Sequence, residues 1–191
     1  MSHRLDFLRR KYSSAIITSL RFGISRLKPV YMMNNNPFQL VVRFSDSMFS
    51  MGDVVALHND VVHQHSAVWF GKLGQPISQG RVDLLNNQIA KNIPTLLYLI
   101  KGNRRKSTAY RAALIRLERD TPKETALIPS YYAEKNLIQY MKVWMKIDQI
   151  EPIEMSEMDK LKAINSIFPI AETLTLSSSG YFLVHESKLI F

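Results

Sequence analysis

The chain has 191 residues, a mass of 22.0 kDa and no cysteine, which suits one domain with a buried core and excludes disulfides, thiolate metal sites and a catalytic cysteine. Its formal net charge is +9, and six of these nine charges lie in residues 1–33, so the remainder is only mildly basic. No apolar run approaches the ~18 residues that span a bilayer, which predicts a soluble, cytoplasmic protein without a membrane partner.

Residues 1–33 are predicted to form a basic amphipathic extension. Apolar residues recur at helical spacing between arginines over residues 5–28. Three interpretations are open: a transit peptide, a helix that lies on DNA or a membrane surface, and a helix that packs on the body. The low-complexity break Asn34-Asn35-Asn36-Pro37 predicts a boundary near this point, followed by one domain over residues 34–191.

The domain is predicted to begin with short strands, the first over residues 39–44. Residues 54–69 are rich in β-branched side chains and predict a hairpin with a tight turn at Asn59-Asp60. The second strand of this hairpin ends in Trp69-Phe70-Gly71-Lys72. Because neighbours on a strand point to opposite faces, one of the two aromatic side chains is expected in the core. The other is expected to face a ligand, which the glycine would let approach the backbone.

The rest of the chain predicts short elements without repeats or βαβ alternation. Residues 109–119 are open between helix and strand, and their place after a turn favours a strand. About six or seven strands with two or three small helices favour an α+β fold built on a curled, barrel-like sheet. The expected elements are a helix over 79–92, strands over 95–101 and 109–119, a turn or short helix over 133–140, a strand over 141–153, a helix over 158–164, a strand or loop over 174–179 and a closing strand over 181–185.

Five short motifs follow one another along residues 38–188. They are a turn at Gly52-Asp53, an aromatic strand end at Trp69-Phe70-Gly71, a returning strand with Tyr110-Arg111-Ala112, a strand from Trp144 to Pro152, and a last strand after small polar residues, Ser177 to Phe182. Their order resembles the EVE and YTH branch of the PUA superfamily. The resemblance implies a pseudo-barrel that holds a modified base in an aromatic-lined pocket, as in the DNA-reading domains of McrBC-type modification-dependent restriction systems. The early-strand Trp of the EVE pattern is absent, and Phe38 or Phe44 could take its place.

The side chains needed to hold an extruded base are present in the sequence. Such a base needs an aromatic slot, hydrogen bonds to its edge, and cations for the flanking phosphates. Taken singly, each candidate also has a structural interpretation, such as a packed corner for Tyr131-Tyr132 or a solvated loop tip for residues 104–106. The base-binding candidates are Trp69, Phe70, Tyr131, Tyr132 and Trp144 for stacking, with Asn59, Asp60 and Ser66 for the base edge. The phosphate-binding candidates are Lys72, Arg104, Arg105, Lys106 and Arg111.

Catalytic and metal chemistry have little support in the sequence. His63 and His65, with His58 nearby, could bind a metal, but no carboxylate joins them at a fixed spacing. Glu186-Ser187-Lys188 has the Glu-x-Lys form of one nuclease core, yet the chain contains no Pro-Asp dipeptide to accompany it. Motifs of the GxSxG, P-loop and GxGxxG types are absent.

The sequence therefore predicts a binding module rather than an enzyme, with no metal or cofactor. The expected partner is nucleic acid, DNA rather than RNA, together with an NTPase or nuclease subunit that would supply any catalysis. An RNA-binding domain of the same architecture stays open, because both nucleic acids demand stacking and phosphate contacts. A protein-interaction module without a base pocket is the second alternative.

Overall fold

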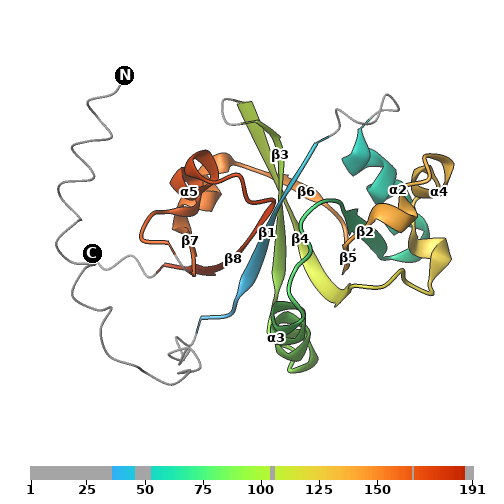
Figure 1. Ribbon diagram of the computed structural model, residues 1–191, viewed down its shortest axis with the longest axis horizontal. Coiled ribbons are helices and arrows are strands. Elements are labelled where there is room, and N and C mark those ends of the chain that lie inside the picture. The colour runs from blue at the N-terminus through green and yellow to red at the C-terminus, as the bar shows by residue number, and fades with distance from the viewer. Residues whose placement is uncertain (1–35, 46–52, 104–105, 165, 188–191) are drawn as a thin grey trace, which may run out of the picture. The chain divides into compact units, whose positions relative to one another are not determined.

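The computed structural model describes residues 36–45, 53–103, 106–164 and 166–187 (Figure 1). The chain divides into two units, Met1–Asn34 and Asn35–Phe191, and the described residues belong to the second. The predicted extension over residues 1–33 lies outside the described residues, so its structure stays a prediction. Among the described helices, none combines the length and the apolar character needed to cross a membrane.

The described strands pair into one sheet, which confirms the α+β class. Their order is β2-β5-β4-β3-β1-β8-β7, with β6 paired to β4. Strands β1 and β3 run parallel, whereas β4 pairs antiparallel with both β3 and β5. These pairings form an open path from β2 to β7, so closure into a barrel stays a prediction. The strands are β1 (Gln39–Phe44), β2 (Val68–Lys72), β3 (Leu96–Asn103), β4 (Lys106–Glu118), β5 (Val143–Ile147), β6 (Glu151–Ile153), β7 (Leu161–Ala163) and β8 (Tyr181–Glu186).

Short helices pack beside the sheet at both of its ends. In Figure 1, α2 and α4 lie beside β2 and β5, whereas α5 lies beside β7 at the other end. The helices are α2 (Val54–His65), α3 (Gln79–Ala90), α4 (Tyr131–Glu134) and α5 (Ile170–Leu176), with 3₁₀ turns η2 (Thr125–Leu127), η3 (Ile138–Tyr140) and η4 (Met155–Lys160).

Both faces of the central strands are buried, which explains their unbroken apolar sequences. In β1, Leu40 and Val42 enter the core cluster that contains residues of α2 and α3, while Val41 enters a second cluster with residues of β7, β8 and α5. The same alternation recurs in β3, where Leu97 and Tyr98 lie in different clusters. A strand covered on both faces loses the apolar–polar alternation of a half-exposed one. The predicted strands over 39–44 and 95–101 are therefore confirmed.

The predicted hairpin over residues 54–69 is wrong, because residues 54–65 form helix α2. The Asp53 carboxylate accepts a hydrogen bond from the Val55 N–H at 3.0 Å and caps the N-terminus of this helix. The buried residues Val54, Val55, His58 and Val62 recur at helical spacing, so burial of this face overrides the β propensity of the valines. The helix ends at Ser66, whose left-handed backbone (φ 63°) forms the C-cap.

Other elements confirm the prediction in part. The helix over 79–92 and the strands over 109–119 and 181–185 are present as α3, β4 and β8. The single strand expected over 141–153 is two strands, β5 and β6. The helix expected over 158–164 is wrong beyond Lys160, because Leu161 and Ala163 are buried where β7 pairs with β8. Residues 170–176 form α5, although a strand or loop was expected from Leu174 onward.

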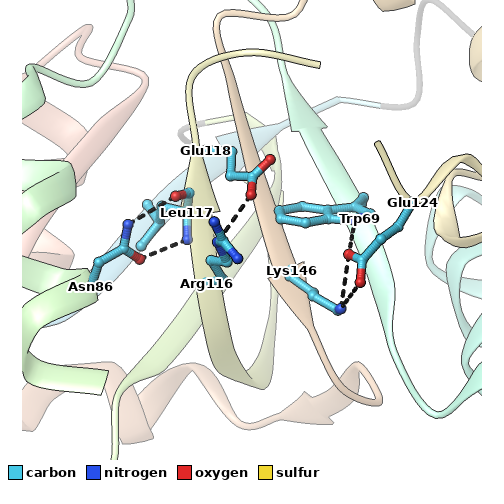
Figure 2. Close-up of polar contacts among 7 residues, drawn as sticks. All are labelled: Trp69, Asn86, Arg116, Leu117, Glu118, Glu124 and Lys146. Carbon is cyan, nitrogen blue, oxygen red and sulfur yellow. Dashed lines mark hydrogen bonds and ion pairs between the residues drawn. The ribbon is translucent and has the colours of Figure 1, made fainter. Parts of the chain in front are cut away.

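Three amide side chains join the helices to the rest of the domain. Each one accepts from the N–H and donates to the C=O of a single backbone residue, which pairs both polar groups at once. Figure 2 shows one of these contacts, in which Asn86 of α3 binds Leu117 of β4 with both distances at 2.9 Å. The other two are Asn59 of α2 with Ile150, both at 2.9 Å, and Gln88 of α3 with Phe38, both at 2.8 Å.

The side-chain cap of α2 predicts that N-cap substitutions in α2 and α3, two helices of the same length, change the stability by different amounts. We expect Asp53→Ala to lower the free energy of unfolding by about 1 kcal/mol, because the Val55 N–H loses its partner. Ser78 is the matched control, since it is the N-cap of α3 but makes no side-chain capping bond, and Ser78→Ala should change stability by only a few tenths of a kcal/mol. Urea titrations followed by circular dichroism measure both. Equal losses would contradict the role of the Asp53 cap.

Candidate functional site

A cavity of about 330 Å³ opens beside the last residues of β1 and β2. This volume lies at the lower end of the range for small-molecule pockets. Two strands supply Phe44, Phe70 and Lys72 to its lining, and α4 supplies Tyr131 and Tyr132. The cavity therefore brings together four residues that the sequence singled out, Phe70, Lys72, Tyr131 and Tyr132, and also Phe44, one of the two substitutes for the missing Trp.

Aromatic rings form much of the cavity wall. Phe44 and Phe70 meet edge to face with ring centroids 5.7 Å apart, and Tyr131 and Tyr132 stack at 4.3 Å with an interplanar angle of 26°. His58 stacks on Phe70 at 4.6 Å and holds that ring from α2. Such pairs prefer offset-stacked or edge-to-face geometry, so each ring fixes the orientation of its neighbour.

The buried polar atoms behind this wall lie within hydrogen-bond reach of one another. The Gly71 N–H donates to the Tyr132 hydroxyl at 2.8 Å, and the hydroxyl lies 3.3 Å from the Gly71 carbonyl and 3.4 Å from His58 Nε2. His58 Nδ1 donates to the Val54 carbonyl at 2.7 Å, which leaves Nε2 as the acceptor in the neutral ring. Burial lowers the pKa of His58 to about 4 and raises the pKa of Tyr132 to about 12. Both side chains are therefore neutral at pH 7 and serve as wall and support.

Two cations line the cavity in different ways. The Arg43 guanidinium donates to the carbonyls of Ser177 at 2.9 Å and of Leu174, at the C-terminal end of α5. Arg43 thus neutralises helix carbonyls and is committed within the domain. Lys72 is only 5% exposed, and its ammonium donates to the carbonyls of Leu73 at 2.9 Å and Gln75 at 3.2 Å. Burial lowers the pKa of the Lys72 ammonium, since it has left water for this site.

The two tryptophans expected to stack on a base do not line the cavity. Trp69 is 1% exposed, donates its indole N–H to Glu124 at 3.1 Å and lies under the Lys146 ammonium, which pairs with Glu124 at 2.8 Å (Figure 2). Trp144 is fully buried against Tyr132, with ring centroids 5.1 Å apart. Both rings belong to the cluster behind the tyrosine pair and support the wall from inside.

Gly71 lines the cavity, and the packing behind it also requires a glycine at this position. A Cβ atom at Gly71 would lie 2.7 Å from Met141 Sδ and 2.9 Å from Trp144 Cζ3. Real Cβ atoms essentially never show such contacts, so the two side chains occupy the space that any larger residue would need. Gly71 therefore has a packing role, and the expectation that it lets a ligand approach the backbone stays a prediction.

The base-edge candidates lie outside the cavity, Asn59 and Asp60 on α2 and Ser66 at its C-cap. The Asn59 amide is occupied by the backbone of Ile150. Asp60 is exposed. Ser66 borders a second, polar cavity of about 430 Å³, which Arg111 also lines. The structure therefore does not bring the three together at the edge of one site.

The remaining phosphate and metal candidates that the structure describes, Arg111, His63 and His65, do not line the cavity. Arg111 pairs with Glu151 at 3.6 Å and with Glu157 at 3.5 Å. Arg104 and Arg105 lie outside the described residues, and so does the side chain of Lys106. His63 and His65 are exposed near the end of α2, and no group of three possible metal ligands occurs in the described part of the chain.

Sequence reasoning missed the apolar part of the cavity lining. Val54, Leu73 and Met141 line it, but isolated apolar residues carry no motif that marks a site. Val54 was placed in a strand, and its position at the start of α2 becomes visible only once Asp53 is recognised as a cap. Phe44 had a signal, because it ends a strand in the region where the resemblance expects an aromatic residue.

The fold and the cavity define an α+β domain with a small, aromatic-walled site. A family model described as Pua-like matches residues 40–188, and the chain therefore belongs to the Pua-like family. Members of this family commonly bind nucleic acids. A search of the curated proteins and a search of the solved structures each found no significant match. The match confirms the predicted likeness to the PUA superfamily.

The packing around Gly71 predicts opposite effects of one substitution at two glycines. We expect Gly71→Ala to destabilise the domain by about 1–3 kcal/mol, because the added methyl group overpacks against Met141 and Trp144. Gly80 is the control, since it lies in α3 with nothing within 4 Å of its Cβ position. Gly80→Ala should stabilise by about 0.5 kcal/mol through the lost flexibility of the unfolded chain. Thermal unfolding measures both changes. If Gly71→Ala does not change the stability, the side chains of Met141 and Trp144 can move to admit the added methyl group.

Proposed function

We propose that this Pua-like domain binds nucleic acid and holds one extruded base in the cavity between Phe44–Phe70 and Tyr131–Tyr132. The observation that carries the proposal is the cavity itself, with rings on its walls and polar groups behind them already paired. A base has two flat faces, and stacking on an aromatic ring is worth about 1–3 kcal/mol per base. Extrusion from a duplex costs a few kcal/mol, which such walls can offset.

The proposed target is a methylated base in DNA. Val54, Leu73 and Met141 give the cavity apolar side chains that suit a methyl group. Transfer of one such group out of water contributes about 0.8 kcal/mol, enough to favour a modified base over its unmodified form by a few-fold. The order of the five sequence motifs supports the same target.

In this proposal the domain is the specificity part of a modification-dependent restriction system. Any cleavage of the nucleic acid would come from an NTPase or nuclease in another domain or chain. Arg104, Arg105 and Lys106 stay the proposed contacts to phosphates. Such contacts position a protein on its nucleic acid and carry no sequence information directly.

Substitution of one cavity ring tests the proposal. We expect Phe44→Leu, which keeps apolar bulk but removes the ring, to weaken binding of the preferred modified duplex by about 1–2 kcal/mol, or roughly 5- to 30-fold. Binding of unmodified duplex should change far less, because contacts to the phosphates hold any duplex. The measurement is a fluorescence-anisotropy titration with duplexes that carry N6-methyladenine, 5-methylcytosine or no modification, and with RNAs of the same sequences.

Phe182→Leu is the matched control. Phe182 is also half-buried and also lies on a strand beside β1, but it packs in the second core cluster and does not line the cavity. It should leave all affinities unchanged, and circular dichroism confirms that both variants are folded. Equal losses on every duplex for Phe44→Leu would refute a base in this cavity. Preference of the wild type for RNA would move the target from DNA to RNA.

A further inference from the structure

Lys72 differs from three other lysines of the described domain, which form ion pairs. The ammonium groups of Lys101, Lys146 and Lys160 each lie within 3.6 Å of a carboxylate oxygen. Lys72 is 5% exposed, lines the cavity, and has no carboxylate partner among the described residues. Its contacts are two backbone carbonyls and the face of the Tyr181 ring, 5.7 Å from the ammonium nitrogen.

These contacts leave part of the ammonium group unsatisfied. An ammonium has three N–H donors and no acceptor, and the carbonyls of Leu73 and Gln75 take two of them. A buried cation without a compensating anion or acceptor is costly, because water no longer solvates it. The ring of Tyr181 stabilises the charge through its face, but it offers no oxygen to the third donor. The domain bears this cost at a position that lines its candidate site.

The burial of Lys72 also restricts what can reach it. Phosphates of a strand that runs over the protein surface contact exposed lysines, and Lys72 is covered by its own loop and by Tyr181. A Cβ atom at Gly180 would lie 3.1 Å from its nitrogen, so the backbone just before β8 also lies near the ammonium. Lys72 and Leu73, whose carbonyl accepts from the ammonium, both line the cavity. This changes the expected role of Lys72 from a surface phosphate contact to a contact inside the site.

We propose that Lys72 makes the cavity selective for a group that presents an oxygen acceptor, either a keto oxygen of a base or a phosphate oxygen of a nucleotide. The proposal rests on the proposed function and specifies its ligand. An acceptor oxygen completes the third hydrogen bond and stabilises the charge, and hydrogen bonds to charged groups are the stronger ones. An exocyclic amino group in the same place would set donor against donor and leave the buried charge uncompensated.

Two matched sets of ligands distinguish the two sources of oxygen. Guanosine and 2,6-diaminopurine riboside exchange a keto oxygen for an amino group, as do uridine and cytidine. Each nucleoside is also compared with its 5′-monophosphate. Binding is measured by chemical-shift titration of the full chain, which detects affinities in the millimolar range. We expect at least tenfold tighter binding of either the keto members or the monophosphates, and the set that shows it identifies the oxygen.

Replacement of the ammonium tests whether Lys72 is the cause. Lys72→Met keeps the stem of the side chain and removes the donors, so the preference should fall to within about twofold. Lys142→Met is the control, because Lys142 is exposed and touches the same strand end, where its backbone N–H donates to the Lys72 carbonyl at 2.9 Å. The control should keep the full preference. Thermal unfolding of both variants is recorded alongside.

The outcomes separate this proposal from the proposed function. If Lys72 only ties the loop that contains Leu73 and Gln75, Lys72→Met will lower the unfolding temperature without changing the preference, and the proposal is overturned. If the variant does not fold, the wild type decides, because equal affinity within both ligand sets also overturns it while leaving a base-binding cavity intact. If no nucleoside or nucleotide shifts any resonance of the cavity residues, the proposed function and this proposal fail together.

Discussion

The double pairing of β4 is the constraint on which the candidate site depends. Its first half pairs with β3 and its second half, from Leu114 onward, with β5, and a register shift between Leu114 and Arg116 lies within the pairing with β5. A bulge of this kind bends a strand and increases its local twist. Strand β2 joins the sheet only through β5 among the described strands, so the bend in β4 determines where β2 ends relative to β1. The contact between Phe44 and Phe70 spans those two strands, which do not pair with each other.

Two buried ionisable side chains near the cavity, His58 and Lys72, differ in their charge and in their hydrogen-bond partners. His58 is neutral, its Nδ1 donates to the Val54 carbonyl, and its Nε2 shares the single proton of the Tyr132 hydroxyl with the Gly71 carbonyl, so its stacking on Phe70 is structural. Lys72 stays short of one acceptor. A fold under selection for stability alone could replace such a lysine by an apolar residue of similar length at a gain. The uncompensated group therefore points to a ligand, whereas the satisfied group does not.

The sequence predicted the central strands, and it failed where tertiary contacts outweigh local propensity. Strands β1, β3 and β8 are short, strongly apolar runs, and no competing signal acts on them. Helix α2 was missed because valines favour strands, whereas the cap at Asp53 and the burial of one helical face select the helix. Of the aromatic candidates, Phe70, Tyr131 and Tyr132 line the cavity, but Trp69 and Trp144 do not. Periodicity places Trp69 and Phe70 on opposite faces, yet it cannot tell which face α4 covers.

The buried tryptophans explain how a four-residue helix can serve as a rigid wall. Helix α4 is too short to be stable by its own hydrogen bonds. Tyr132 is instead fixed by Trp144 at its ring and by Gly71 at its hydroxyl, and Gly71 is the residue that lets Met141 and Trp144 pack so closely. Preorganised walls lower the entropy that binding must offset. The two tryptophans, which the sequence predicted to stack on a base, thus support the rings of Tyr131 and Tyr132 in a fixed orientation that suits a planar ligand.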